Sequence, residues 1–316
     1  MSFTRRQFAT LAAAGPLAGL ASMATTASAA GHSAGAPALY DMSLGSYRIT
    51  ALLDGIAPLG RGFFFGDEVA IDEVAEAAGL TDVLPAPVNA YLLQSDDRTI
   101  LIDAGMGALD LLGPGLGRMS SALAALGVNE TDIDTIIVTH LHPDHVGGLL
   151  NGNGPAFSNA EIIVAEAEHA FWTDAGMRAQ APTEAQGLFD LAEGVLGAYS
   201  GRVTLASDGE ALAPGVSLMV SPGHTMGHGL LRIDGGAHQL LMIADTLHSA
   251  DVHMALPDTG FGFDTDPVLA AASRRRVFDM ASADKMLIAG SHVHFPGFGR
   301  IRAVGDNYRF APATLL

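Results

Sequence analysis

The chain of 316 residues contains no cysteine, so it forms no disulfide bonds and offers no thiolate to a metal ion. Basic residues are also scarce, because 16 Lys and Arg stand against 34 Asp and Glu, a formal net charge of −18. An acidic chain of this kind is not expected to bind nucleic acid or anionic membrane surfaces. Any metal ion must therefore be held by His, Asp or Glu side chains.

Long apolar runs are missing as well. The N-terminal run from Ala9 to Met23 is short and rich in Gly and Ala, which argues against a membrane anchor and against stable membrane insertion. Paired arginines, Arg5-Arg6, precede this run, and Ala27-Ser28-Ala29 after it offers a cleavage site. The segment resembles a twin-arginine export signal, with an ordinary secretory signal as the alternative. We therefore expect residues 1–30 to direct the protein to the periplasm or the medium.

What the chain has in quantity is apolar surface and glycine. Hydrophobic residues make up 49% of the sequence, and there are 38 glycines, which suits an α/β protein with many tight turns. Removing Arg5 and Arg6 with the signal leaves 14 basic residues against 34 acidic ones, a net charge of −20. The remaining length, residues 31–316, is enough for one large domain.

Four ligand-type side chains lie within six residues after an apolar β-branched run. Ile136 to Val138 predicts a buried strand, and the proline and paired glycines beyond it predict a loop. That loop carries His140, His142, Asp144 and His145. Imidazole and carboxylate are ligands that Zn²⁺ and similar metals accept. The first two histidines can face one ion from an extended segment, and the last two residues can face a second.

The pattern of strands suggests two similar halves. In each half a strand-rich stretch ends in an aspartate, Asp103 or Asp245, and helical segments follow. The last clear strand, Met286 to Ala289, is followed by two candidate ligands, His292 and His294. We expect a helix from Pro267 to Ala283, with Arg274, Arg275 and Arg276 on its exposed side.

Three blocks resemble a known family. The run THLHPDHVGG from Thr139 resembles the His-x-His-x-Asp-His signature of the metallo-β-lactamase superfamily, and PGHTMGH from Pro222 matches its Pro-Gly-His-Thr-x-Gly-His block. HVHFPGFG from His292 is similar to the C-terminal block of the methyl parathion hydrolase-like branch, in which the first histidine binds metal. The resemblance extends from about Tyr47 to Phe310.

The resemblance implies an α/β fold, the four-layer αβ/βα sandwich with two facing mixed β-sheets and outer helices. It also implies two divalent metal ions, zinc by preference, with Mn, Co and Fe as alternatives. The implied ligands are His140, His142 and His224 for the first ion, Asp144, His145 and His292 for the second, and Asp245 for both. Asp103 would orient the metal loop through hydrogen bonds. The sequence assigns no role to His228, His253 or His294.

The expected reaction is hydrolysis. Two divalent ions, two aspartates and one hydroxide leave one residual positive charge, which suits a substrate that develops an oxyanion. A metal-bridging hydroxide would attack, with Asp144 and Asp245 as the catalytic carboxylates. The alternatives are a β-lactamase-type amide hydrolase and a non-hydrolytic metal-binding or redox protein. The intact signature favours a hydrolase, since diiron redox relatives usually replace one of its histidines with a carboxylate.

The branch includes organophosphate hydrolases, arylesterases and acyl-homoserine lactonases. The expected substrate is therefore a neutral, apolar small molecule: an ester, a lactone such as an acyl-homoserine lactone, or an organophosphate triester. The residues expected to line its pocket are Phe63, Phe64, Phe65, Phe171, Trp172 and His248. Core packing is the alternative for the aromatic residues, and a surface or capping role for the histidine. Relatives in this branch tend to be dimers, which leaves a homodimer open.

Overall fold

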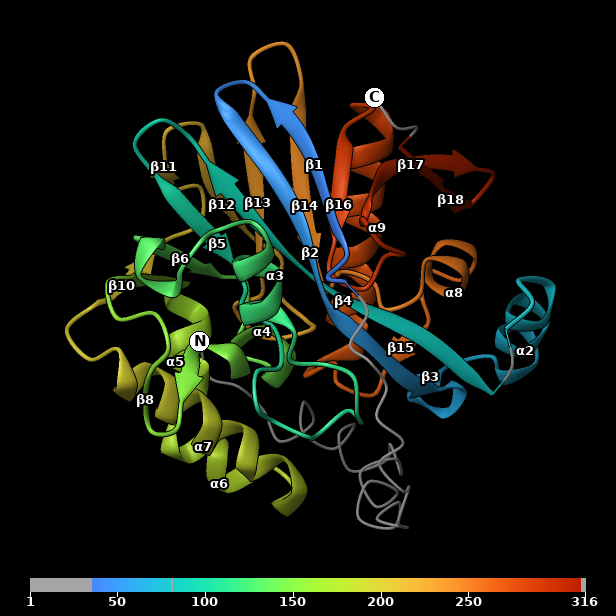
Figure 1. Cartoon of the computed structure of the whole chain (residues 1–316). Coiled ribbons are helices and arrows are strands. Elements are labelled where there is room, and N and C mark those ends of the chain that lie inside the picture. The colour runs from blue at the N-terminus through green and yellow to red at the C-terminus, as the bar shows by residue number, and fades with distance from the viewer. Residues whose placement is uncertain (1–35, 81, 314–316) are drawn as a thin grey trace.

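Two seven-stranded β-sheets form the centre of the computed structural model, which describes residues 36–80 and 82–313 (Figure 1). The first sheet contains, in spatial order, β1 (Leu39–Leu44), β2 (Tyr47–Gly60), β4 (Val83–Gln94), β5 (Thr99–Ile102), β6 (Thr135–Val138), β9 (Glu161–Ala165) and β10 (Val203–Ala206). The second contains β11 (Ala211–Ala213), β12 (Val216–Val220), β13 (Gly229–Asp234), β14 (Gln239–Ala244), β16 (Leu287–Gly290), β17 (Phe298–Val304) and β18 (Asn307–Pro312). The predicted export segment, residues 1–30, lies outside the described residues.

Both sheets are mixed, as expected. In the first, β1, β2, β4 and β5 pair antiparallel, and β5, β6, β9 and β10 pair parallel. In the second, β14 and β16 pair parallel within an otherwise antiparallel sheet. β6 lies between two parallel neighbours and is buried along its whole length, which explains why Ile136–Val138 reads as an uninterrupted apolar run.

Eight α-helices are described: α2 (Glu68–Ala77), α3 (Met119–Ala125), α4 (Pro143–Val146), α5 (Glu166–Trp172), α6 (Ala175–Gln180), α7 (Thr183–Ala198), α8 (Ala250–Ala255) and α9 (Pro267–Ala283). One core cluster joins Leu123 of α3 and Phe189 of α7 to Ile136 of the first sheet. Another joins Phe278 of α9 to Ile288 of the second sheet. Among the described helices, none is long and apolar enough to cross a bilayer.

A third core cluster fills the space between the sheets. Ile49 and Ile100 of the first sheet meet Leu231 and Met242 of the second, all of them buried. Helices therefore cover the outer faces while the inner faces pack together, and this is the predicted αβ/βα sandwich.

Helix α9 has the predicted bounds, but the exposure predicted for its three arginines was wrong for Arg274. This side chain is 1% exposed and donates hydrogen bonds to the backbone oxygens of Thr246, Pro257 and Thr259. A helix turns by about 100° per residue, so three consecutive side chains cannot share one face. Arg274 instead points inward, where loop carbonyls satisfy its guanidinium group.

Several shorter elements connect these strands and helices. The 3₁₀ helices are η1 (Arg61–Phe63), η2 (Glu130–Asp132) and η3 (Gly147–Leu149), and two small ribbons pair β3 (Phe64–Phe65) with β15 (Gly260–Phe261) and β7 (Leu150–Asn151) with β8 (Gly154–Pro155). β2 and β4 run on past the first sheet as a long hairpin that carries α2 at its far end (Figure 1). A small core around Leu59, Leu84 and Phe261 joins this hairpin to β15.

Candidate metal centre

The predicted ligands come from loops at the ends of strands in both sheets. β6 leads into His140, β12 into the loop of His224, β14 into Asp245 and β16 into His292. Left-handed backbone occurs at Asp103, directly after β5, with φ 59°, and at Ala244, the last residue of β14, with φ 40°. Such conformations cost energy and concentrate at functional sites. Asp103 lies 2.8 Å from His145 Nδ1, and Ala244 directly precedes Asp245, so both strained residues lie beside the predicted ligands.

Three imidazoles form the first group of ligand atoms. His224 Nε2 lies 3.2 Å from His140 Nε2 and 3.0 Å from His142 Nδ1. Burial and neighbouring imidazoles hold the pKa values of His140 and His142 well below the ordinary value. Both rings are therefore neutral near pH 7, the protonation state in which imidazole binds a metal ion.

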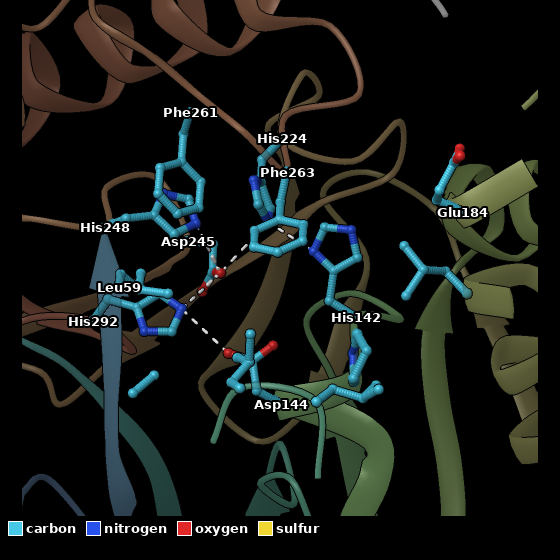
Figure 2. A pocket seen from close by; sticks show the side chains of 15 residues that line it. Leu59, His142, Asp144, Glu184, His224, Asp245, His248, Phe261, Phe263 and His292 are labelled. Carbon is cyan, nitrogen blue, oxygen red and sulfur yellow. Dashed lines mark hydrogen bonds and ion pairs between the residues drawn. The ribbon is translucent and has the colours of Figure 1, made fainter. Parts of the chain in front are cut away.

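The second group consists of Asp144, His145 and His292. Asp144 Oδ2 lies 3.7 Å from His145 Nε2 and 3.5 Å from His292 Nε2. Asp245 stands between the two groups, with Oδ2 2.9 Å from His292 Nε2 and 3.4 Å from His224 Nε2 (Figure 2). Its carboxylate can therefore reach both groups, as a bridging ligand must.

Unpartnered polar atoms show that these residues fit metal ions. His145 Nε2 and Asp245 Oδ1 are buried without a hydrogen-bond partner of acceptable geometry, although they lie 3.2 Å from each other. Burying such atoms unpaired is costly. Donor atoms of His140, His145 and Asp245 lie within 4.8 Å of one another, as do those of each histidine group above. Nitrogen and carboxylate oxygen donors at this spacing suit zinc and similar divalent ions.

The pKa values of His145 and Asp245 are shifted in opposite directions by their neighbours. Burial lowers the pKa of His145, but Asp245 and the other two carboxylates around it raise this pKa well above its ordinary value. For Asp245 the two effects are reversed. Burial raises its pKa, but the surrounding imidazoles, of which His145 has the largest effect, bring the pKa well below its usual range. Asp245 therefore favours positive charge at His145, whether a proton or a metal ion supplies it.

Further groups hold the ligands in place. Asp103 lies 2.8 Å from His145 Nδ1 and accepts hydrogen bonds from the backbone N–H and the hydroxyl of Thr139, so it connects the start of the metal loop to His145. His292 Nδ1 lies 2.8 Å from the backbone oxygen of Pro87. The sequence analysis missed Asp264, whose Oδ1 lies 2.9 Å from His224 Nδ1. Its one sequence signal is its place in the acidic Asp-x-Asp-Pro segment before α9.

The structure also places the histidines to which the sequence gave no role. His228 Nδ1 donates to Ser221 O, and its Nε2 accepts the backbone N–H of Asp245. Burial lowers the pKa of His228 to about 3, so this link stays neutral. His253 Nδ1 accepts the backbone N–H of His248, and His294 is exposed.

A cavity of about 330 Å³ opens onto the cluster (Figure 2). His142, Asp144, His224, Asp245, His248 and His292 form one end of it. The other walls are formed by Ala57, Leu59, Leu111, Leu112, Pro143, Glu184, Leu188, Phe261 and Phe263. Apart from the cluster, Glu184 is the one charged residue of this lining, which contains no Lys or Arg. Such a cavity suits a neutral, apolar ligand.

Of the six residues predicted for the substrate pocket, His248 is the one that lines this cavity, with its ring stacked on Phe261 at 3.7 Å. Phe171 and Trp172 border a small neighbouring cavity of about 20 Å³ behind His142.

The three consecutive phenylalanines support the cavity wall from behind. Phe63 stacks on Phe263 at 5.4 Å, Phe64 meets Phe261 edge-on, and Phe65 pairs with Gly260. The sequence analysis did not single out Phe261, Phe263 or the leucines of the wall, because nothing local distinguishes them from core residues.

Known proteins resemble this chain in sequence and in fold. Residues 83–292 match the model of the metallo-beta-lactamase superfamily. An N-acyl homoserine lactonase of a Bacillus species is 30% identical over 230 residues, covering 67% of this chain and 83% of the relative.

Two solved structures resemble it over most of its length. The hydrolase AbOPH of the beta-lactamase superfamily has a TM-score of 0.82 and 28% identity, covering 88% of this chain and 98% of its own. AidC, a dizinc quorum-quenching lactonase solved with a product bound, shares the fold with a TM-score of 0.82 and 24% identity, covering 89% and 99%. With its fold, its motifs and its buried His–Asp cluster, the chain belongs to the metallo-beta-lactamase superfamily and is a metal-dependent hydrolase.

Proposed function

We propose that this protein hydrolyses neutral lactones of the N-acyl homoserine lactone class. The observation that carries the proposal is the cavity, which ends on the His–Asp cluster and is otherwise almost entirely apolar. Support comes from the relative named as an N-acyl homoserine lactonase, which aligns over 83% of its own length.

The cavity offers different surroundings to the two parts of such a substrate. The lactone ring would lie against Asp144, Asp245 and His248, where the polar groups converge. The acyl chain would lie along Leu111, Leu112 and Leu188. Each methylene group of the chain that these side chains bury would stabilise binding by about 0.8 kcal/mol. Glu184 also lines this wall, and its side chain is exposed.

We propose two metal ions, zinc in each case, held by the predicted ligands in two groups that share Asp245. Bound there, the ions would lower the pKa of a water molecule and polarise the lactone carbonyl. In the reaction, water adds to the carbonyl carbon, the ring C–O bond breaks, and the ring oxygen leaves as a hydroxyl group. Asp144 and Asp245 are the carboxylates of the cluster that line the cavity, so they lie where this step would exchange its protons.

The same lining disfavours β-lactams. These substrates carry a carboxylate, and the cavity lining offers no Lys or Arg to pair with it. Glu184 adds a negative charge at the far wall, so an anionic substrate would also meet like charge. A neutral ester or phosphotriester meets neither obstacle, and these remain the compounds with which a lactone must be compared.

The test is a comparison of initial rates for the purified, metal-loaded protein. The panel contains an acyl-homoserine lactone, an aryl ester, a dialkyl aryl phosphotriester and a β-lactam, with Asp245→Ala as the inactive control. We expect the highest kcat/KM on the lactone. A phosphotriester or ester turned over faster than the lactone would replace the proposed substrate class, and turnover of none would remove it.

We also propose that residues 1–30 act as a twin-arginine export signal, on the basis of Arg5-Arg6 and Ala27-Ser28-Ala29. Cell fractionation of the full chain and of a variant with both arginines changed to lysine tests this. We expect the wild type in the periplasm and the variant in the cytoplasm. Equal export of both would overturn the twin-arginine route.

A further inference from the structure

Glu168 of α5 is a buried carboxylate that the proposed reaction does not use. It is fully buried, and its four described hydrogen bonds all come from uncharged donors. Burial raises the pKa of Glu168, although the four hydrogen bonds oppose that shift. Keeping a carboxylate in such a place is costly, so its partners indicate what it provides.

Those partners lie on the two loops that carry the three-histidine group. Glu168 Oε1 accepts the backbone N–H of Leu141 at 2.9 Å, and Leu141 stands between His140 and His142. Glu168 Oε2 accepts the hydroxyl of Thr225 at 2.6 Å, next to His224. The same oxygen accepts the N–H of Gly227 at 2.9 Å, and Trp172 Nε1 donates to Oε1 at 2.7 Å.

The contact between the second loop and α5 is also close in space. A Cβ atom on Gly227 would lie 2.0 Å from the backbone nitrogen of Glu168, so the loop rests directly on the first turn of the helix. A backbone hydrogen bond from Gly229 to Thr139 joins the bases of the two loops. Glu168 joins them nearer the imidazoles, and the loops come from different sheets.

We propose that Glu168 is a positioning residue, which holds the loop of His140 and His142 against the loop of His224 so that their imidazoles meet at one metal ion. This inference rests on the assignment of these three histidines to one ion in the proposed function. Both carboxylate oxygens are needed, because each accepts from a different loop. Glu168 does not line the cavity, and none of its four described hydrogen bonds goes to a ligand side chain.

Glu168→Gln tests the proposal. The amide keeps one acceptor oxygen, but its NH₂ group then faces two donors, and a backbone N–H among them cannot turn away. We expect the affinity of the three-histidine site for Zn²⁺ to fall 10–100-fold, the range typical for groups that orient metal ligands. The site of Asp144, His145 and His292 should keep its affinity. Competition with a chromophoric chelator measures both, and the absorption spectrum of the Co²⁺-loaded protein reports the geometry.

A matched control separates positioning from stability alone. Tyr199 is fully buried in the same core, and its hydroxyl bonds to Leu149 O and Phe157 N. Tyr199→Phe should lower the melting temperature yet leave both Zn²⁺ affinities and the Co²⁺ spectrum unchanged. Where Glu168→Gln is insoluble, Thr225→Val removes one of the same hydrogen bonds and should weaken the three-histidine site by a smaller factor.

Two outcomes would overturn the proposal. One is a Glu168→Gln variant that keeps the wild-type Zn²⁺ affinity of the three-histidine site and the wild-type Co²⁺ spectrum. If only Thr225→Val is soluble, the same result in that variant counts. The other is an equal loss of metal in Tyr199→Phe. Because these measurements need no substrate, a protein that fails on lactones but shows the expected metal loss would refute the proposed function and leave this inference intact.

Discussion

Single carboxylates outside the ligand set determine how the imidazoles of this site point. Asp264 is one of them, with Oδ1 against His224 Nδ1 and Oδ2 accepting the backbone N–H of Phe261. Arg274 lies 3.9 Å from the same carboxylate and is itself fixed by backbone oxygens. A hydrogen bond at Nδ1 fixes the tautomer that leaves Nε2 free for the metal.

Asp264→Ala should therefore lower Zn²⁺ affinity about 10–100-fold, and activity at limiting Zn²⁺ with it. Metal analysis after dialysis against a fixed free Zn²⁺ concentration measures the effect. Asp266→Ala is the control two residues away, because Asp266 caps α9 and should cost about 1 kcal/mol of stability without loss of metal. Full metal occupancy in Asp264→Ala would contradict the orienting role.

The two histidines of the last block offer a second comparison of single residues. His292 is buried against Asp245 and the backbone of Pro87, whereas His294 is exposed. We expect His292→Ala to lose one metal ion per chain and at least about 100-fold in kcat/KM, a loss of some 2.7 kcal/mol in transition-state stabilisation. His294→Ala should stay close to wild type in both. Metal content and steady-state rates of the two variants measure these effects. A larger loss in His294→Ala than in His292→Ala would show that His294 is the metal ligand.

At the scale of elements, the segment between β5 and α3 supplies part of the cavity wall and depends on one buried side chain. Asp54 of β2 accepts backbone N–H groups of Met106, Gly117 and Met119, at the two ends of this segment. Leu111 and Leu112 lie between those ends and line the cavity. The segment has no helix or strand of its own, so these hydrogen bonds set its position.

Asp54→Asn replaces one acceptor oxygen by an NH₂ group and should loosen the segment. We expect stability to fall by about 1–3 kcal/mol and KM to rise more for a long-chain than for a short-chain lactone, with metal content unchanged. Asp132→Asn is the control, since Asp132 accepts the backbone N–H of Asn129 at an exposed 3₁₀ helix. An equal rise of KM for both chain lengths would show that the segment does not contact the acyl chain.

At the scale of the whole molecule, the sequence predicted the features that are encoded in short, local patterns of residues. Apolar runs located strands such as β6, and the motifs indicated the residues that the fold brings together around Asp245. The layer arrangement came from the resemblance and is confirmed by the core between the sheets. Oligomeric state and the ends of the domain stay predictions.

The remaining features depend on long-range contacts that no local pattern records. Glu168 binds Thr225 across 57 residues, Asp54 binds Met106 across 52, and Asp264 binds His224 across 40. Arg274 was predicted to be exposed because an arginine is costly to bury, and the loop carbonyls that satisfy it are distant in sequence. The cavity wall is formed by leucines that resemble core residues until the chain folds.

The proposed metal ions would link the two sheets of the molecule. One group combines His140 and His142, which follow β6 of the first sheet, with His224, which follows β12 of the second. The other combines Asp144 and His145 from the first half with His292 from the second. Without ions, unpartnered ring and carboxylate atoms would stay buried between the halves.

Metal removal should therefore lower the stability of the whole fold. Free Zn²⁺ at 1,000 times the dissociation constant of one site raises the free energy of unfolding by about 4 kcal/mol, because the ion binds the folded chain and not the unfolded one. We expect the melting temperature to fall after chelation and to recover with added Zn²⁺. Calorimetry at several free Zn²⁺ concentrations measures both changes. His292→Ala, which keeps only the three-histidine site, should show a smaller Zn²⁺ dependence than His294→Ala. An unchanged melting temperature in protein shown to be metal-free would mean that packing between the sheets suffices and that the ions serve the reaction alone.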